Sequence, residues 1–396
     1  MGRGAVLALV TLAHAFSALA ALAVAPLAPF VLDAFHLSRG QVGLLLPAVY
    51  LGGVLMALPA GWLTDRFGVR TTLAFGQTLT AALVIAAAAV STLPTLLACL
   101  VLAGFGFSVT NPATGKAIVE WFPAHQRGVA MGIKQTGLTL GGIGAALVLP
   151  PIATGVGWRQ ALAVAGGLCL LSAAMVATLY RRPALVSGEA TSAWPRLGEL
   201  GLFLRRPGVL VLFASGLALS VTQSSLLAYL ALFARETFAI SAVAAGQLLA
   251  LAQAGGTASR LVWGYVSDRY FGSRRRPGVV ITALVGAGAC AVLALGAALP
   301  GPLIPFLALV AGAGVFGWVG LYFALVAELG GRRYAGLLTG VAVSFAWSGV
   351  LVGPPSFGLL LDATNGYAWP WLTLSATAVV VAVALARLSP LVQRDA

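Results

Sequence analysis

Long apolar runs alternate with short polar links along the whole chain. Each run holds about twenty residues or more, which is enough for a helix to cross the ~30 Å hydrocarbon core of a bilayer. Backbone groups inside a bilayer must find hydrogen-bond partners within their own segment, so every run predicts a helix. We predict twelve membrane-spanning helices, over residues 5–32, 40–60, 72–92, 95–118, 129–153, 159–180, 207–234, 243–264, 278–299, 302–327, 335–361 and 367–388.

The first run resembles a secretory signal peptide, because one arginine precedes an apolar stretch. Its apolar part extends from Ala5 to about Leu32, whereas the apolar core of a signal peptide has only about 7–15 residues. We therefore expect the first run to be a retained membrane span.

The composition agrees with a membrane protein, since 60% of the residues are hydrophobic and 8% are charged. Soluble domains carry about 25% charged residues. The net charge of +13 raises the alternative of a nucleic-acid-binding protein, but the arginines lie in short links between apolar runs, so we expect no nucleic-acid partner. Cys99, Cys169 and Cys290 lie inside apolar runs and are interpreted as core residues, without a disulfide framework, a metal site or a cofactor.

The basic residues are distributed unequally between the two sides of the predicted membrane. With the N-terminus placed in the cytoplasm, three of the 23 basic residues lie on the outer side, namely Arg39, Arg159 and Arg235. Cytoplasmic loops are enriched in Lys and Arg, so we predict that both termini are cytoplasmic. The residues on the cytoplasmic side are Arg3, Arg66, Arg70, Lys116, Arg127, Arg181, Arg182, Arg196, Arg205, Arg206, Arg269, Arg274, Arg275, Arg276, Arg332, Arg333, Arg387 and Arg394.

The longest polar link, residues 181–206, joins the sixth predicted span to the seventh. Six spans lie on each side of it. We therefore predict an N-terminal half over residues 1–180, a cytoplasmic linker over 181–206 and a C-terminal half over 207–396. We expect the chain to act as a monomer.

One charged motif occurs twice. Residues 61–70 read GWLTDRFGVR, and residues 264–276, which begin 203 residues later, read GYVSDRYFGSRRR. The copies follow the second and the eighth predicted spans, which are equivalent positions in two homologous six-span halves. A weaker echo pairs Glu120 and Arg127 after span four with Glu328 and Arg332 after span ten. Internal repeats of this kind are typical of secondary transporters, which bind substrate near the interface of the repeats.

The first copy of this motif resembles the signature loop of the major facilitator superfamily. The pattern GxLxDRxGxR stands here as Gly61, Leu63, Asp65, Arg66, Gly68 and Arg70. The second copy keeps Gly264, Asp268, Arg269 and Gly272, with one residue inserted before the last glycine. Together with the twelve spans and the midpoint link, the resemblance covers the whole chain. It implies an all-α membrane protein whose twelve transmembrane helices form two pseudo-symmetric six-helix halves.

The resemblance also implies that this loop holds the two halves together on the cytoplasmic side while the transporter faces outward. We expect Asp65 to pair with Arg127, and Asp268 to pair with Arg332 or Arg333. Gly61 and Gly68 are expected at tight turns and close helix approaches. The alternative is that these charges only set the topology. The expected gating residues are Gly61, Asp65, Arg66, Gly68, Arg70, Arg127, Asp268 and Arg269.

Three ionisable residues lie within the predicted spans: His14, Lys134 and Arg260. A charge near the middle of a bilayer costs at least ~2.5 kcal/mol, so each is a candidate functional residue. All ten acidic residues lie in links or near span ends. Two buried cations without an acidic neighbour predict a site for an anion. The alternative for each cation is a side chain that reaches the interface or bonds a neighbouring helix.

Arg260 lies roughly 6–10 Å inside the cytoplasmic boundary, and Lys134 roughly 10 Å. The pattern Arg-x-x-x-Gly-x-x-x-Asp that begins at Arg260 resembles monocarboxylate porters and oxalate/formate exchangers, in which this arginine binds the carboxylate. The superfamily resemblance places spans five and eight at the interface of the halves, so both cations are expected to reach one cavity. Residues 111–137 are similar to bacterial facilitators of small anions, such as cyanate permease relatives.

His14 lies near the middle of span one, where it could carry a coupling proton, bind the substrate, or stay neutral and bond a neighbouring helix. A small pocket needs a few convergent polar groups in an apolar wall. The further candidates for substrate binding, each with packing as the alternative, are Tyr50, Asn111, Gln135, Gln223, Tyr229, Gln253 and Trp347. Trp318 and Tyr322 are predicted to be core residues.

We favour a secondary transporter of a small anion, with a monocarboxylate as the first choice, in the bacterial cytoplasmic membrane. A proton could be cotransported, whereas anion exchange would need no proton carrier. The alternative is a drug/proton antiporter, although the span-five motif and the buried carboxylates of that class are missing. The sequence lacks H-E-x-x-H and G-x-S-x-G motifs and has only His14, His36 and His125 as histidines, so an enzyme is not expected.

Overall fold

The computed structural model describes residues 2–181, 207–272 and 274–388, apart from the side chains of residues 58, 124, 125, 128, 129, 207, 327 and 330–337. Within these ranges every regular element is a helix. The contacts divide the chain into two compact units. Unit 1 comprises Met1–Glu189 and Ala234–Ala250, and unit 2 comprises Ala190–Phe233 and Leu251–Ala396. The predicted linker, apart from Arg181, lies outside the described residues.

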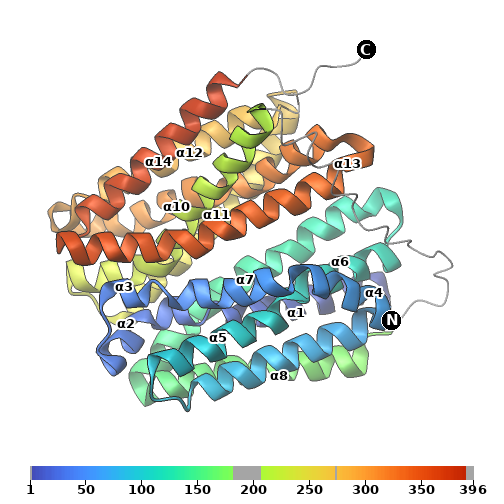
Figure 1. Cartoon of the computed structure of the whole chain (residues 1–396), viewed down its shortest axis with the longest axis horizontal. Helices are drawn as coiled ribbons and strands as arrows, with labels where there is room; N and C mark the ends of the chain where they lie inside the picture. Colours follow the sequence, from blue (N-terminus) through green and yellow to red (C-terminus); the bar gives the residue numbers. More distant parts are fainter. Residues whose placement is uncertain (1, 182–206, 273, 389–396) are drawn as a thin grey trace. The chain divides into compact units, whose positions relative to one another are not determined.

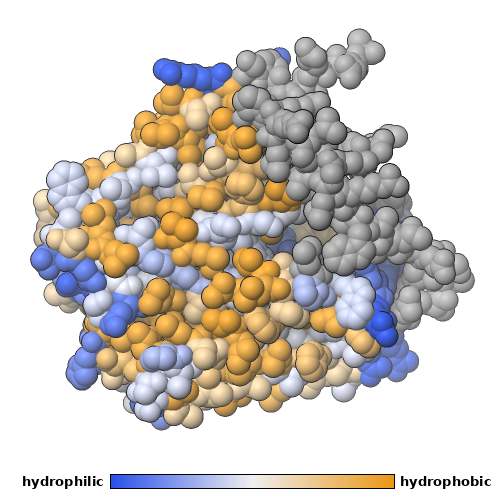
Figure 2. Space-filling view, viewed as in Figure 1, coloured by the Kyte–Doolittle hydropathy of each residue, from blue (hydrophilic) through white to orange (hydrophobic). Residues whose placement is uncertain are grey.

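Unit 1 is a helical bundle in which α1 packs against α7 and α8, while α4 packs against α5 and α8 (Figure 1). Figure 2 shows apolar side chains over the flanks of these helices and hydrophilic ones towards the helix ends. This is the distribution that a lipid environment requires. The helices are α1 (Arg3–Ala21), α2 (Val24–Phe35), α3 (Arg39–Val42), α4 (Leu45–Ala87), α5 (Leu93–Ser108), α6 (Thr110–Trp121), α7 (Ala124–Val156) and α8 (Trp158–Leu179).

Two predicted spans of unit 1 are each built from two helices. Span 5–32 is interrupted after Ala21, and span 95–118 is interrupted after Ser108. Both interruptions lie about one turn before a proline, Pro26 or Pro112. A proline has no N–H for the helical bond, and its ring collides with the carbonyl four residues earlier. The sequence contains these prolines, but the apolar pattern alone did not predict the interruptions.

The signature loop lies inside α4, where the chain reverses direction at Gly68. Gly68 has φ 78°, a conformation that glycine adopts without steric cost. The Thr72 hydroxyl donates a hydrogen bond to the Leu63 carbonyl at 3.1 Å. Residues nine apart would be ~13 Å apart along a straight helix, so this bond shows that the chain turns back. The tight turn predicted at Gly68 is confirmed, and α4 supplies both spans two and three.

The backbones of α1 and α7 approach closely at two glycines. A Cβ atom at Gly141 would lie 2.2 Å from the Ala15 carbonyl oxygen, and one at Gly137 would lie 2.5 Å from the Thr11 carbonyl oxygen. Small residues allow membrane helices to pack at this distance. The glycines of span five therefore bring α7 directly against α1. A close approach was also expected at Gly61 and Gly68, but a Cβ atom at either position would meet nothing within 4 Å among the described residues of unit 1.

We expect Gly141→Ala to destabilise unit 1 by about 1–3 kcal/mol, because the new methyl group has no room against a backbone carbonyl. The matched control is Gly132→Ala in the same helix, where a Cβ atom would meet nothing within 4 Å. That control should be neutral or slightly stabilising, because alanine favours helix. The measurement is the apparent melting temperature of purified protein in detergent. Equal melting temperatures for the two variants would contradict the close packing.

Unit 2 has a core in which α12 packs against α13 and α14. Trp318 is 2% exposed and Tyr322 is fully buried, so the prediction that both are core residues is confirmed. The elements are α10 (Pro207–Phe238), α11 (Ala242–Arg269), α12 (Arg275–Leu293), η1 (Gly296–Ala298), η2 (Gly301–Leu303), α13 (Ile304–Thr364) and α14 (Ala368–Arg387), with Ala234–Ala250 of α10 and α11 belonging to unit 1.

Eleven segments of the described chain are long and apolar enough to cross a membrane. They correspond to eleven of the predicted spans, and α13 supplies two of them. The remaining span, 243–264, lies in α11, which has 28 residues and is therefore long enough to cross a bilayer. Gln247, Gln253 and Arg260 make α11 more polar than the others. Polar residues at such a position are functional candidates by default.

Candidate functional site

Lys134 of α7 is buried, with 3% of its surface exposed. Its ammonium group donates hydrogen bonds to the side-chain oxygen of Asn111, at 2.5 Å, and to that of Gln135, at 3.2 Å. Both acceptors are neutral amides, and both residues are exposed. The amide groups fix the position of the ammonium group but leave its charge uncompensated.

No carboxylate pairs with Lys134 in the described part of unit 1. Asp33 pairs with Arg235 at 2.9 Å, and Glu236 pairs with Arg39 at 2.9 Å. The remaining described acids of the unit, Asp65 and Glu120, bond other partners near the helix ends. A buried ammonium group without a counter-ion is costly, so this site favours the approach of an anion.

Asn111 lies at the interruption between α5 and α6. It is the second residue of α6 and directly precedes Pro112, so the local backbone follows from the proline. The neighbouring hydroxyl of Thr110 is buried and has no hydrogen-bond partner among the described residues. Interrupted helices are common at the binding sites of secondary transporters, because the interruption frees polar groups for the substrate. Thr110 was not among the residues proposed from the sequence, although its place beside Asn-Pro was a possible signal.

His14 of α1 lies next to the same part of α7. It is 2% exposed, and a Cβ atom at Gly137 would lie 2.9 Å from its Cβ atom. The Nδ1 atom of its ring has no hydrogen-bond partner in the described structure. The structure therefore brings together four predicted residues of unit 1, namely His14, Asn111, Lys134 and Gln135. Tyr50 is half-buried on α4.

Arg260 of α11 is half-buried in unit 2, and its Nε atom donates a hydrogen bond to the Phe316 carbonyl of α13 at 2.9 Å. Gln253 precedes Arg260 by seven residues in α11 and is 6% exposed. A separation of seven residues is two helical turns, so both residues lie on one face of α11. This face carries two of the three polar residues that distinguish α11 from the other predicted spans.

The other predicted residues of unit 2 differ in burial. Tyr229 is fully buried, and its ring lies 4.6 Å from that of Phe357. Gln223 has a buried side-chain oxygen without a hydrogen-bond partner in the described residues. Trp347 is half-buried on α13. Tyr229 thus lies in an aromatic cluster, whereas the amide of Gln223 retains an unused acceptor.

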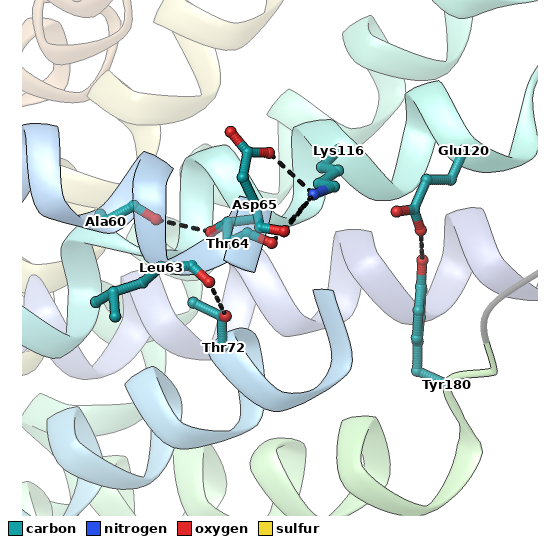
Figure 3. A network of polar contacts seen from close by, with 8 residues as sticks. All are labelled: Ala60, Leu63, Thr64, Asp65, Thr72, Lys116, Glu120 and Tyr180. Carbon is teal, nitrogen blue, oxygen red and sulfur yellow. Dashed lines mark hydrogen bonds and ion pairs between the residues drawn. The ribbon is translucent and has the colours of Figure 1, made fainter. Parts of the chain in front are cut away.

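Asp65 of the signature loop pairs with Lys116 of α6 at 2.9 Å (Figure 3). The predicted partner was Arg127, and that prediction is wrong. The Arg127 guanidinium donates to the carbonyls of Val119 and Phe122, both at 3.0 Å. These carbonyls lie at the C-terminal end of α6, where a cation is stabilised by the helix dipole.

The second copy of the motif in unit 2 has a similar arrangement. Arg275 donates to Asp268 at 2.5 Å and to Glu328 at 3.0 Å. Gly272 has a positive φ of 55°, as Gly68 does in the first copy. The predicted partners Arg332 and Arg333 have side chains outside the described set. Arg275 was assigned only to the cytoplasmic side from the sequence, so its role as a bridging cation is a finding of the structure.

Residues 10–354 match the family described as Major Facilitator Superfamily. The chain belongs to the major facilitator superfamily. The resemblance seen in the signature loop is thereby confirmed. As a member of this superfamily, the chain is a transport protein that crosses the membrane several times, and it is not an enzyme.

Three relatives in the superfamily illustrate its range. The chain is 30% identical over 356 residues to an uncharacterized MFS-type transporter of Mycobacterium tuberculosis, covering 86% of this chain and 76% of the relative. It is 23% identical to a hexuronate transporter of Bacillus subtilis, covering 91% and 88%. It is 30% identical to monocarboxylate transporter 11 of Mus musculus, covering 79% and 71%. The structure of a D-xylose-proton symporter matches with a TM-score of 0.81 at 17% identity, over 98% of both chains.

We expect Asp65→Asn to reduce transport at least tenfold while changing stability by no more than about 1 kcal/mol, because a partly exposed ion pair contributes little to stability. Exchanging the charges, as Asp65→Lys with Lys116→Asp, should restore part of the activity. The measurements are uptake per folded protein and the melting temperature. Full activity of Asp65→Asn at normal expression would exclude a gating role for this pair.

Proposed function

We propose that the chain transports a small organic anion that carries a carboxylate, and that Lys134 binds this anion. The observation that carries the proposal is the buried ammonium group, which is bonded only to the neutral amides of Asn111 and Gln135 within the described residues. The names of the relatives support an acidic substrate, since a hexuronate transporter, a monocarboxylate transporter and a probable sulfoacetate transporter are among them.

The chemistry of the Lys134 site suits reversible binding. A carboxylate that approaches Lys134 supplies the missing negative charge in a region of low dielectric constant, where the attraction is strong. The Thr110 hydroxyl and the Nδ1 atom of His14 are unused polar groups in the same unit, and they can bond the substrate oxygens. A site assembled from one cation and a few neutral groups binds an anion without holding it permanently.

Arg260 is the proposed carboxylate-binding residue of unit 2. A guanidinium group presents two parallel N–H donors to a carboxylate, which a lysine cannot do. Its Nε bond to the Phe316 carbonyl fixes the side chain against α13. The remaining proposed substrate-binding residues of unit 2 are Gln253, Gln223, Trp347 and Tyr229.

Two modes of coupling follow from the residues of unit 1. In the first mode, His14 takes up a proton when the anion neutralises Lys134, so proton and anion move together. In the second mode, two anions exchange through the site and no proton is carried. A pH gradient across liposomes would drive net uptake only in the first mode. We further propose that both termini face the cytoplasm of a bacterial cell, because cytoplasmic loops are enriched in Lys and Arg and the links on the side of the termini carry most of the basic residues.

Counterflow in liposomes tests the proposed function. Purified protein is reconstituted with an internal carboxylate, and uptake of a labelled carboxylate is followed against empty liposomes. We expect counterflow with at least one of pyruvate, lactate, glucuronate or sulfoacetate, and none with neutral sugars. A protein that moves none of these anions but extrudes lipophilic dyes would be the drug antiporter that the sequence left as an alternative.

A further inference from the structure

A cationic cavity lies in unit 1 where three helical segments end. It has a volume of about 520 Å³ and is bounded by the signature loop around Gly68, by the C-terminal part of α6 and by the end of α8. Figure 3 shows two of its polar contacts, Lys116 with Asp65 and Glu120 with Tyr180. The size falls within the range of small-molecule sites and exceeds the need of a single ion.

The charges of the cavity do not balance. Four basic residues line it, and two acidic ones, Asp65 and Glu120. Asp65 is compensated by Lys116, and Glu120 accepts a hydrogen bond from the neutral Tyr180 hydroxyl at 3.2 Å. The other three basic residues make no ion pair among the described residues; they are Arg66, Arg70 and Arg181. The cavity thus has a formal surplus of positive charge and favours a phosphate or another anion.

An apolar cavity adjoins the cationic one. It has a volume of about 270 Å³ and lies between the two limbs of α4 and the end of α5. Phe67 lines both cavities, and Phe75 lines the apolar one. Both residues are exposed, at 53% and 66%. The hydroxyl of Thr72, one of the few polar groups in the lining, is already bonded to the Leu63 carbonyl. This lining suits a hydrocarbon chain.

We propose that the two cavities together bind one anionic phospholipid of the surrounding membrane. The phosphodiester group occupies the cationic cavity next to Arg66, Arg70 and Arg181, and one acyl chain passes Phe67 into the apolar cavity. A free phosphate would use only the first cavity, and an apolar molecule only the second. A phospholipid matches both, because its charge and its hydrocarbon meet at the level where the helices leave the bilayer.

Binding to the full-length protein can be measured by native mass spectrometry after delipidation in detergent. The probes are dioleoyl phosphatidylglycerol, dioleoyl phosphatidylcholine and inorganic phosphate. We expect the dissociation constant for phosphatidylglycerol to be at least tenfold lower than for phosphatidylcholine. Removing one cation near an anionic headgroup should weaken binding about fivefold, so Arg181→Gln should lose that factor. The control Arg3→Gln, another exposed arginine of unit 1 that lines neither cavity, should lose none.

The apolar cavity is tested by a variant and a matched control. Phe75→Ala should weaken phosphatidylglycerol binding several-fold, whereas Phe306→Ala should not, although Phe306 is 65% exposed and presents the same ring to the surroundings. Equal affinity for the two lipids would overturn the proposal. Equal losses of phosphatidylglycerol affinity for Arg181→Gln and Arg3→Gln would show that the lipid is attracted to the basic surface in general, without a specific site. Saturation of the cationic cavity by inorganic phosphate with no effect of Phe75→Ala would identify a free-anion site instead.

Discussion

Lys134→Met is expected to reduce carboxylate uptake at least a hundredfold and to leave the protein as stable as before, or more stable. Removing one partner of a desolvated ion pair costs about 3–5 kcal/mol. If Lys134 is removed and the substrate carboxylate is left without its partner, this cost corresponds to a loss of uptake of more than a hundredfold. Among the described residues, the same ammonium group has only amide partners when no substrate is bound. Methionine has a similar volume and needs no counter-ion, so the folded state gains from the change.

The combination of lost uptake and retained stability separates a binding residue from a structural one. A lysine that only held α7 to α6 would lower the melting temperature when replaced. The measurements are uptake at a substrate concentration below KM and the melting temperature of purified protein. Lys134→Arg, which retains the charge, should keep measurable uptake. The control is Thr139→Val in the same helix, whose hydroxyl bonds only the Thr136 carbonyl within the described structure. Unchanged uptake by Lys134→Met would refute the proposed site.

Arg260→Ala is expected to abolish carboxylate uptake, and Arg260→Lys to raise KM for the carboxylate roughly tenfold to a hundredfold. Lysine keeps the charge but presents no planar pair of donors, so the loss should fall on substrate binding. The comparison of KM with kcat for Arg260→Lys is therefore the decisive measurement. The controls are the same two substitutions, to Ala and to Lys, at Arg387, which is exposed at the end of α14.

A structural explanation for Arg260 predicts a different outcome. The Nε bond to the Phe316 carbonyl ties α11 to α13, and its loss alone would lower the melting temperature without changing KM. Phe316 offers only its backbone, so the bond cannot be removed from that side by mutation. If Arg260→Ala retained carboxylate uptake with an unchanged KM, the residue would have no place in the substrate site.

The arrangement of the two signature loops could be predicted only in part. Gly68 indicated where the chain turns in the first loop, because glycine adopts a positive φ without strain, whereas the positive φ of Gly272 in the second loop is a finding of the structure. The partners of the aspartates were not predictable in the same way. Asp65 bonds Lys116, which lies 51 residues away, and Asp268 bonds Arg275. Several basic residues lay near each aspartate in the sequence, and only the tertiary packing decided which one it reached; for Asp65 this is the packing of α4 on α6.

The sequence by itself determined the membrane-spanning helices, the reversal at Gly68 and the presence of cations at depth. These properties follow from hydropathy, from backbone conformation and from composition, which are local features of the chain. Only the tertiary structure decided that Lys134 donates a hydrogen bond to Asn111, 23 residues earlier. It also decided that His14 lies next to the same part of α7, and that arginines of the signature loop line a cavity. Such contacts depend on which helix faces meet. Close packing at glycines such as Gly141 determines which faces these are, and that packing exists only in the folded chain.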